Sequence, residues 1–293
     1  MLWLGKKPAE AAPAARDAID PAPLPLALDR AICARKLAAL QEESAQAADA
    51  GTGDDDAGTA GLAPFLEALT RKHELFARLL APEALGTIDQ EGLDALLETV
   101  FTARRRLPGA FQGLDLDRIA AAIRELLYGE APLAERLEGF AGALGVKGAK
   151  EARAAWDFGA ELLHYREPVQ YPLMSRWVWD VNTMSGALRE LVRGNDTMRN
   201  IPLDGRPEMF EGARRDIAGF LSEEGYYRDV PFLIDLLLAK AYADYVQDMA
   251  KGVGVFAAEL GARNDPLEFV AKMLGIDPHR RGGRSRAKRA TVH

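Results

Sequence analysis

Residues Trp156 to Asp180 read WDFGAELLHYREPVQYPLMSRWVWD. This segment holds three of the four tryptophans of the chain, together with two tyrosines, two prolines and several charges. Large aromatic rings are costly to expose, so their crowding predicts a buried hub or a binding site. The prolines predict a helix that ends near Tyr165, an extended turn, and a second helix from about Leu173 to Arg193.

On that second helix, Trp177 and the apolar residues after it are spaced three or four positions apart, which places them on one face of the helix. Trp179 falls off this row, which predicts that it faces a second surface, either a second packed layer or a partner. A polar, turn-rich loop follows at residues 194–207, and such loops are often functional. The candidates for contacting a partner are Tyr165, Arg166, Arg176, Trp177, Trp179 and Arg199.

Outward from the hub, apolar residues recur at helical spacing and alternating β-branched segments are missing. The pattern predicts an all-α fold, an irregular multi-helix arrangement in one domain or two lobes, with disordered termini. We expect a disordered leader at 1–23, a helix with an acidic Gly/Asp linker at 24–61, an N-terminal helical lobe at 62–144, a C-terminal lobe with the hub at 145–278, and a disordered basic tail at 279–293.

The composition limits the classes of protein to which this chain can belong. With 293 residues, 48% of them hydrophobic, the chain can bury a sizeable core. The longest apolar run, Val230 to Leu238, is too short to span a membrane, and the N-terminus lacks a signal-like hydrophobic stretch, so we expect a cytoplasmic protein without a membrane span. A single cysteine and four isolated histidines predict no disulfide and no metal site, and no cofactor signature is present.

Charge is distributed unevenly along the chain. The net charge is -7, yet the tail HRRGGRSRAKRATVH holds six Lys/Arg and no acid. A basic tail of this kind attracts nucleic acid, an anionic membrane or an acidic protein. A helix predicted from Asp89 to Arg106 ends in three arginines, which would complement the helix dipole in its last turn or hold an anion.

Three titratable residues are candidates for chemistry. His164 and Glu167 lie close together where the predicted helix ends and the turn begins, and Asp235 interrupts the apolar run of a predicted central helix. A histidine and carboxylates held together could transfer a proton. The alternative is structural: a hydrogen-bonded histidine at a helix end, and a buried carboxylate paired with an arginine such as Arg166 or Arg176.

The hairpin-like piece LGVKGAKEA, residues 144–152, and the later piece LLHYREPVQYPLMSRWV resemble helix-hairpin-helix DNA glycosylases over residues 144–180. The resemblance implies that Lys147, Gly148 and Lys150 approach a DNA phosphate. Where those proteins carry a catalytic aspartate, this chain has Met174 and Ser175, and their lysine nucleophile has no counterpart. The resemblance therefore implies a shared fold rather than shared base-excision chemistry.

Three functions remain open from the sequence. The first is a helical accessory or interaction protein that engages an unidentified protein partner through the Trp-rich hub and the basic tail. The second is a helix-hairpin-helix protein that binds nucleic acid through the tail or residues 144–152. The third is a small-molecule enzyme that uses His164, Glu167 and Asp235.

Overall fold

The computed structural model describes residues 17–49, 60–112, 114–195, 197–252 and 266–277. Over these ranges the protein is all-α, as predicted, and its only β-structure is two isolated bridges. The helices are α1 (Arg30–Asp49), the 3-10 helix η1 (Ala60–Leu62), α2 (Ala63–Leu79), α3 (Pro82–Leu85), α4 (Gln90–Glu98), α5 (Leu107–Ala110), α6 (Leu116–Tyr128), α7 (Leu133–Ala143), α8 (Ala149–Arg166), α9 (Ala187–Leu191), α10 (Pro207–Glu223), α11 (Val230–Gly252) and α13 (Pro266–Met273). None of these helices is long and apolar enough to cross a membrane.

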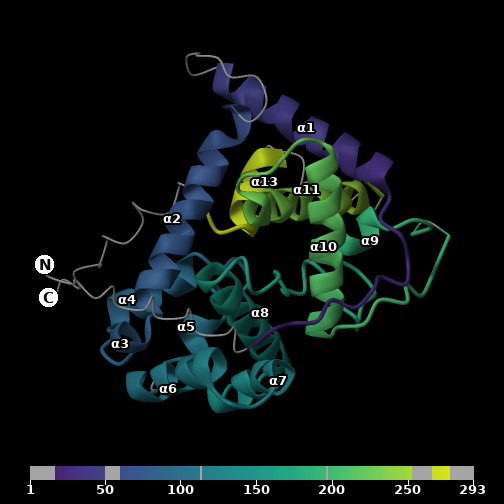
Figure 1. Cartoon of the computed structure of the whole chain (residues 1–293). Coiled ribbons are helices and arrows are strands. Elements are labelled where there is room, and N and C mark those ends of the chain that lie inside the picture. The colour runs from purple at the N-terminus through teal and green to yellow at the C-terminus, as the bar shows by residue number, and fades with distance from the viewer. Residues whose placement is uncertain (1–16, 50–59, 113, 196, 253–265, 278–293) are drawn as a thin grey trace, which may run out of the picture.

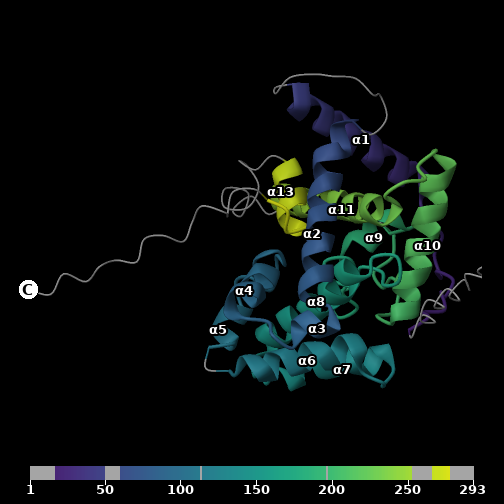
Figure 2. The same cartoon turned by 60° about the vertical axis from the view of Figure 1, so that its left-hand side comes forward.

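Helices α8 and α11 organise the packing. Helix α8 contacts α2, α5, α6 and α7, while α11 contacts α1, α9, α10 and α13. Figures 1 and 2 show α6 and α7 side by side at one end of the molecule and α1 across the other, with α2 and α10 running between the two ends. Buried apolar residues form one cluster that extends from Leu28 to Leu274, so the two predicted lobes share a single core.

Local sequence explains why α8 forms where it does. Gly148 occupies its N-cap, Glu151 lies in its first turn, and His164 and Arg166 lie in its last turn, which suits the helix dipole at both ends. Gly159 lets α7 approach closely, because a Cβ at this position would lie 2.8 Å from the ring of Phe140. Helix α8 is consequently buried along most of its length.

The helix predicted from Leu173 to Arg193 does not form; only α9 is helical in this range. The Asp180 side chain accepts a hydrogen bond from the amide of Asn182 (2.9 Å), which stabilises a turn. Met184 and Gly186 follow with φ of 51° and 137°, values that no right-handed helix contains. The apolar residues are spaced three and four positions apart, as in a helix, but these turn residues interrupt the helical backbone.

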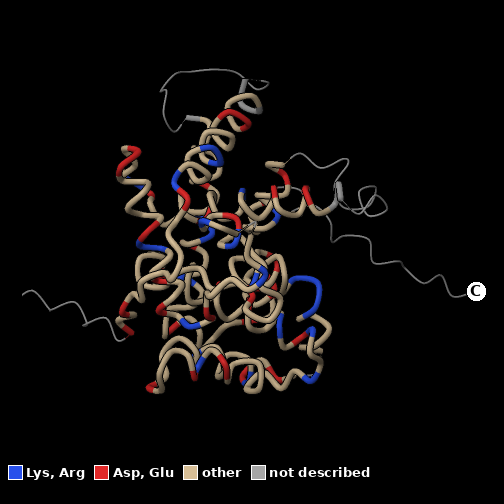
Figure 3. The backbone as a smooth tube through the Cα atoms, turned by 90° about the vertical axis from the view of Figure 1, so that its right-hand side faces the viewer, with Lys and Arg blue, Asp and Glu red and all other residues tan. Residues whose placement is uncertain are grey.

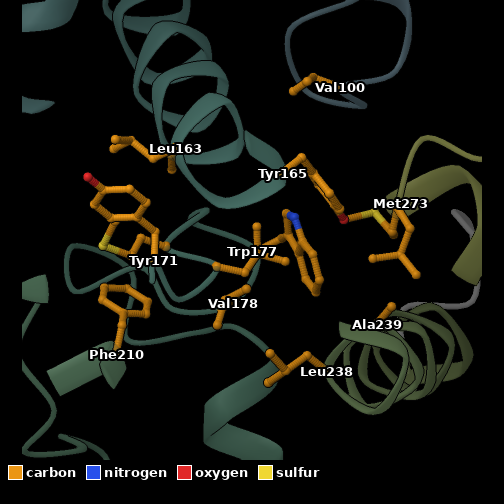
Figure 4. Close-up of a cluster of buried hydrophobic side chains, with 14 of the residues drawn as sticks. Val100, Leu163, Tyr165, Tyr171, Trp177, Val178, Phe210, Leu238, Ala239 and Met273 are labelled. Atoms are coloured by element: carbon orange, nitrogen blue, oxygen red, sulfur yellow. The ribbon is translucent and has the colours of Figure 1, made fainter. Parts of the chain in front are cut away.

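The two tryptophans of this segment are buried. Trp177 is 4% exposed and Trp179 is 2% exposed, so the predicted second surface lies inside the core. Figure 4 shows Trp177 in the apolar cluster with Tyr165 from the end of α8 and Met273 from α13. The irregular backbone of the segment lets both rings turn inward, which a straight helix would not.

The predicted leader, residues 1–23, differs from the structure at residues 17–23. The Asp17 carboxylate accepts hydrogen bonds from the Arg136 guanidinium (2.6 Å) and the Tyr171 hydroxyl (2.7 Å). The amide of Ala22 donates to the carbonyl of Glu208 (2.9 Å). These residues are therefore packed against the helices, whereas 1–16, most of the acidic linker and the basic tail lie outside the described residues.

We predict that Gly186→Ala destabilises the protein. A Cβ at this position would lie 2.6 Å from the carbonyl oxygen of Val178, and φ of 137° is strained for any other residue. The expected loss of unfolding free energy is about 2–3 kcal/mol, measured by urea denaturation. The matched control is Gly219→Ala in α10, where a Cβ meets nothing within 4 Å and a gain of about 0.5–1 kcal/mol is expected. Equal effects of the two changes would contradict the prediction.

Candidate anion-binding site

One face of α8 carries three buried titratable side chains. Asp157, Glu161 and His164 are spaced about one helical turn apart and are 0%, 1% and 2% exposed. A buried charge is tolerated only when it is paired, so each of these residues requires a partner from another part of the chain.

Asp157 pairs with Arg176, which follows the turn after α8. Its carboxylate accepts hydrogen bonds from the Arg176 amide (2.8 Å) and from the guanidinium (2.7 Å). Burial raises the pKa of Asp157 above its ordinary value of 3.8, and the arginine opposes this shift. The Arg176 side chain is itself 26% exposed and reaches from this pair toward the surface.

Glu161 pairs with Lys72 of α2. The ammonium donates to the carboxylate (2.9 Å) and to the carbonyl of Leu274 (2.8 Å), and it lies 3.6 Å from the centre of the Tyr165 ring. Burial raises the pKa of Glu161 and lowers that of Lys72, while the attraction between the two charges opposes both shifts. The pair joins α2, α8 and the end of α13 inside the core.

His164 is held by an acceptor at each ring nitrogen. Nδ1 lies 2.8 Å from the carbonyl oxygen of Tyr171, and Nε2 lies 2.9 Å from a carboxylate oxygen of Asp235. The cavity beside this pair measures about 20 Å³, enough for about one water. Glu167 lies apart, paired with Arg166 (2.8 Å) and with its side chain 46% exposed. The structure thus brings His164 and Asp235 together but separates Glu167 from them.

The predicted partner-binding residues do not form one surface. Tyr165 is buried without a hydrogen-bond partner for its hydroxyl among the described residues, and Arg166 lies over the ring of Tyr128. Trp177 and Trp179 are in the core, whereas Arg199 is exposed in the loop before α10. Of this set, only Arg176 lines an open cavity with other cations.

That cavity, which we call the basic pocket, has a volume of about 350 Å³. Five cationic residues and three others line it: Arg105, Arg106, Lys150, Arg153, Arg176, Phe101, Thr102 and Ala154. No acidic residue is in this set. The first four cations are exposed, and the ion pairs seen among the described residues include none of them. Figure 3 shows Lys and Arg interspersed with Asp and Glu over most of the described chain.

The prediction that the run of three arginines ends a helix from Asp89 to Arg106 is wrong. Helix α4 ends at Glu98, so Arg104, Arg105 and Arg106 lie in a turn and do not complement its dipole. Arg104 points inward: its guanidinium pairs with Asp277 at 2.9 Å and lies 5.0 Å from the centre of the Phe101 ring. Arg105 and Arg106 line the basic pocket.

The hairpin residues contribute only in part. Gly148 is the N-cap of α8, and the Glu151 carboxylate occupies the space that a side chain at 148 would need. This carboxylate already lies at the positive end of the helix, where the resemblance places a phosphate. Lys147 is exposed outside the basic pocket, whereas Lys150 lines it. Arg105, Arg106 and Arg153 were not candidates in the sequence, although the arginine run hinted at two of them.

The fold and the site define an all-α protein with an open cationic pocket beside a helical hairpin. Comparison of the chain with protein-family models, curated proteins and solved structures found no match. Across the described part of the chain, no three His, Cys, Asp or Glu side chains lie where they could hold a metal ion together.

We predict that Lys72→Met costs about 3–5 kcal/mol of unfolding free energy, because it leaves the Glu161 carboxylate buried without its cation. Chemical denaturation measures the loss. The double variant K72M/E161M removes both charges and should recover much of the stability. A double variant less stable than K72M would contradict the role assigned to the pair.

The loss in K72M should also depend on pH. Burial raises the pKa of Glu161 above its ordinary value of 4.5, and without Lys72 nothing as close opposes that rise. A carboxyl whose folded pKa is raised contributes stability that is present below pH 4.5 and is lost as pH rises through the folded pKa. Denaturation curves should therefore show K72M closest to the native protein near pH 4.5 and furthest from it at neutral pH. A difference that shrinks as pH rises would be inconsistent with a buried, unpaired carboxylate.

Proposed function

We propose that the protein is a helical accessory protein that binds single-stranded nucleic acid through its basic pocket. One observation carries this proposal: a hollow of about 350 Å³ is lined by no acid and by five cations, of which Arg176 is paired with Asp157 and Asp180 and the other four are exposed, in a chain whose net charge is -7. In an acidic protein, such a local excess of positive charge favours a binding site for an anionic ligand over a purely structural role.

The chemistry of the lining side chains suits phosphate. Four of the five cations are arginines, whose planar guanidinium groups donate two parallel hydrogen bonds to phosphate oxygens. Arg176 is fixed by Asp157 at 2.7 Å, and Lys150 and Arg153 stand on the long helix α8. The backbone of the pocket and the Arg176 side chain are therefore held in place before a ligand arrives, which lowers the entropic cost of binding.

Its size and composition favour a single strand over a duplex. A volume of about 350 Å³ is that of a small-ligand site, which is too small to enclose a duplex. Half-buried Phe101, beside Arg104, adds the edge of an aromatic ring to the lining, and aromatic contacts with bases tolerate any sequence. The acidic remainder of the chain would repel the dense charge of a duplex.

The other two functions receive less support. Trp177 and Trp179 are covered by the protein's own core, so these rings have no free face for a partner. The space beside His164 and Asp235 admits about one water, which is too small for a substrate. Both observations leave the basic pocket as the better candidate.

We predict that the double reversal R105E/R153E weakens binding of a labelled single-stranded oligonucleotide at least about tenfold at 50 mM salt, because both side chains would oppose the phosphates. Fluorescence anisotropy measures the dissociation constant. Because two phosphate contacts are lost, the slope of log K against log salt should fall in magnitude by about 1.4.

The matched control is R193E/R215E, which changes the net charge equally at two exposed arginines, one after α9 and one in α10, neither of which lines the basic pocket. It should bind within about twofold of the native protein. Equal losses of affinity in the two variants would mean that overall charge causes the effect, and this would contradict the proposal. A native protein that binds no single strand would also contradict it.

A further inference from the structure

Most cations of the basic pocket have no counter-charge among the described residues. The fifth cation, Arg176, is the exception, because carboxylate oxygens of Asp157 and Asp180 lie 2.7 Å and 3.7 Å from its guanidinium. The other four are exposed and belong to no ion pair seen in the described ranges: Arg105, Arg106, Lys150 and Arg153. The pocket therefore holds four positive charges that nothing in its lining neutralises.

The acids closest to these cations in the sequence are turned to other partners. The Glu151 carboxylate lies against Gly148, at the N-cap of α8. Asp277 pairs at 2.9 Å with Arg104, the one arginine of the run that is outside the basic pocket. Because no carboxylate lines the pocket, its four free charges repel one another.

The four charges are crowded. Arg105 and Arg106 are neighbours in the sequence, and Lys150 and Arg153 lie about one turn apart on the same face of α8. A sphere with the volume of the hollow, about 350 Å³, is only about 9 Å across, close to the screening length of about 8 Å at physiological salt. Salt therefore screens the repulsion only in part, and an anion that enters the hollow relieves it.

The number of charges favours one kind of nucleotide over another. An internal nucleotide of a strand brings one negative charge, whereas a phosphate monoester at the end of a strand carries about two at neutral pH. With the diester that follows it, a phosphorylated end brings about three charges. The monoester also presents three acceptor oxygens to the forked donors of the arginines. Such an end balances four cations more closely than the interior of a strand does.

We propose that the basic pocket selects the phosphorylated end of a single strand and holds the terminal phosphate monoester between the arginine turn and the first turns of α8. This inference rests on the proposed function and narrows it from any single strand to strands that end in a phosphate. A 5′ phosphate and a 3′ phosphate offer the same chemistry, so the test includes both.

The test uses a ten-nucleotide single strand that is labelled internally and varied only at its ends. The four forms carry hydroxyls at both ends, a 5′ phosphate, a 3′ phosphate, or a 5′ methylphosphate, in which a methyl group makes the monoester a diester of similar size. Anisotropy with the full chain should show at least one phosphorylated strand bound at least about tenfold more tightly than the hydroxyl strand. The methylphosphate strand should lose most of this gain.

The gain should depend on pH through the ligand. The second pKa of a phosphate monoester is about 6, so its charge falls from about two to about one between pH 7.5 and pH 5. Arginine and lysine ordinarily keep their charge over this range. The affinity of the phosphorylated strand relative to the hydroxyl strand should therefore fall several-fold as pH is lowered, while that of the methylphosphate strand stays constant. A ratio that does not change with pH contradicts recognition of a monoester.

Two charge-matched variants locate the effect. R105E/R153E should bind the phosphorylated and hydroxyl strands within about twofold of each other, because two of the four free cations are reversed. R193E/R215E changes the net charge equally outside the pocket and should keep the full gain. All four side chains are exposed, so both variants should unfold at the same urea concentration as the native chain.

The possible results distinguish this inference from the proposed function. A native chain that binds none of the four strands contradicts both. If the strands bind with equal affinity whatever their ends, the single-strand site stands and selection of a phosphorylated end is overturned. A gain that survives in R105E/R153E would mean that the monoester binds outside the basic pocket, which also overturns the inference.

Discussion

The ion pair between Glu161 and Lys72, with both side chains 2% exposed, constrains how the helices of the structure pack. Each buried charge costs several kcal/mol unless a partner reaches it, so α2 must pack against α8. The same constraint acts one turn away on either side, where Asp157 requires Arg176 and His164 faces Asp235 of α11. Apolar burial supplies most of the free energy of folding. The polar pairs favour the one helix packing in which every buried charge has its partner.

The same helix links the core to the surface. Arg176 pairs with Asp157 in the interior and lines the basic pocket with its exposed part, and Lys150 and Arg153 project from the first turns of α8. The opposite wall is held through Arg104 and Asp277, a pair nearly as buried as those of the core. A pocket made from three segments far apart in the sequence is thus positioned by contacts that also stabilise the fold. The backbone that carries its cations is held in place, and the Arg176 side chain is also fixed by Asp157.

Sequence reasoning succeeded where the signals were local and failed where one segment depended on distant ones. A helix was predicted to begin at Asp89, and the side chain of Asp89 accepts a hydrogen bond from the first turn of α4. The segment after Pro172 has helical apolar spacing, yet its turn residues and the burial of Trp177 and Trp179 give an irregular path. His164 and Asp235 were both candidates, but their pairing, and the separation of Glu167 from them, required the packing of α8 against α11.

The sequence by itself determined that the protein is all-α and where most helices lie, because periodicity, caps and prolines act within a few residues. It also determined an acidic chain with a basic tail. Only the tertiary structure decided that Arg105, Lys150 and Arg176 share one pocket and that Arg104, next to Arg105 in the sequence, turns inward to pair with Asp277. The physical reason is that charges act through space: in the sequence these residues are an arginine run and scattered cations, and their convergence is set by how α5, which follows the arginine run, packs against α8.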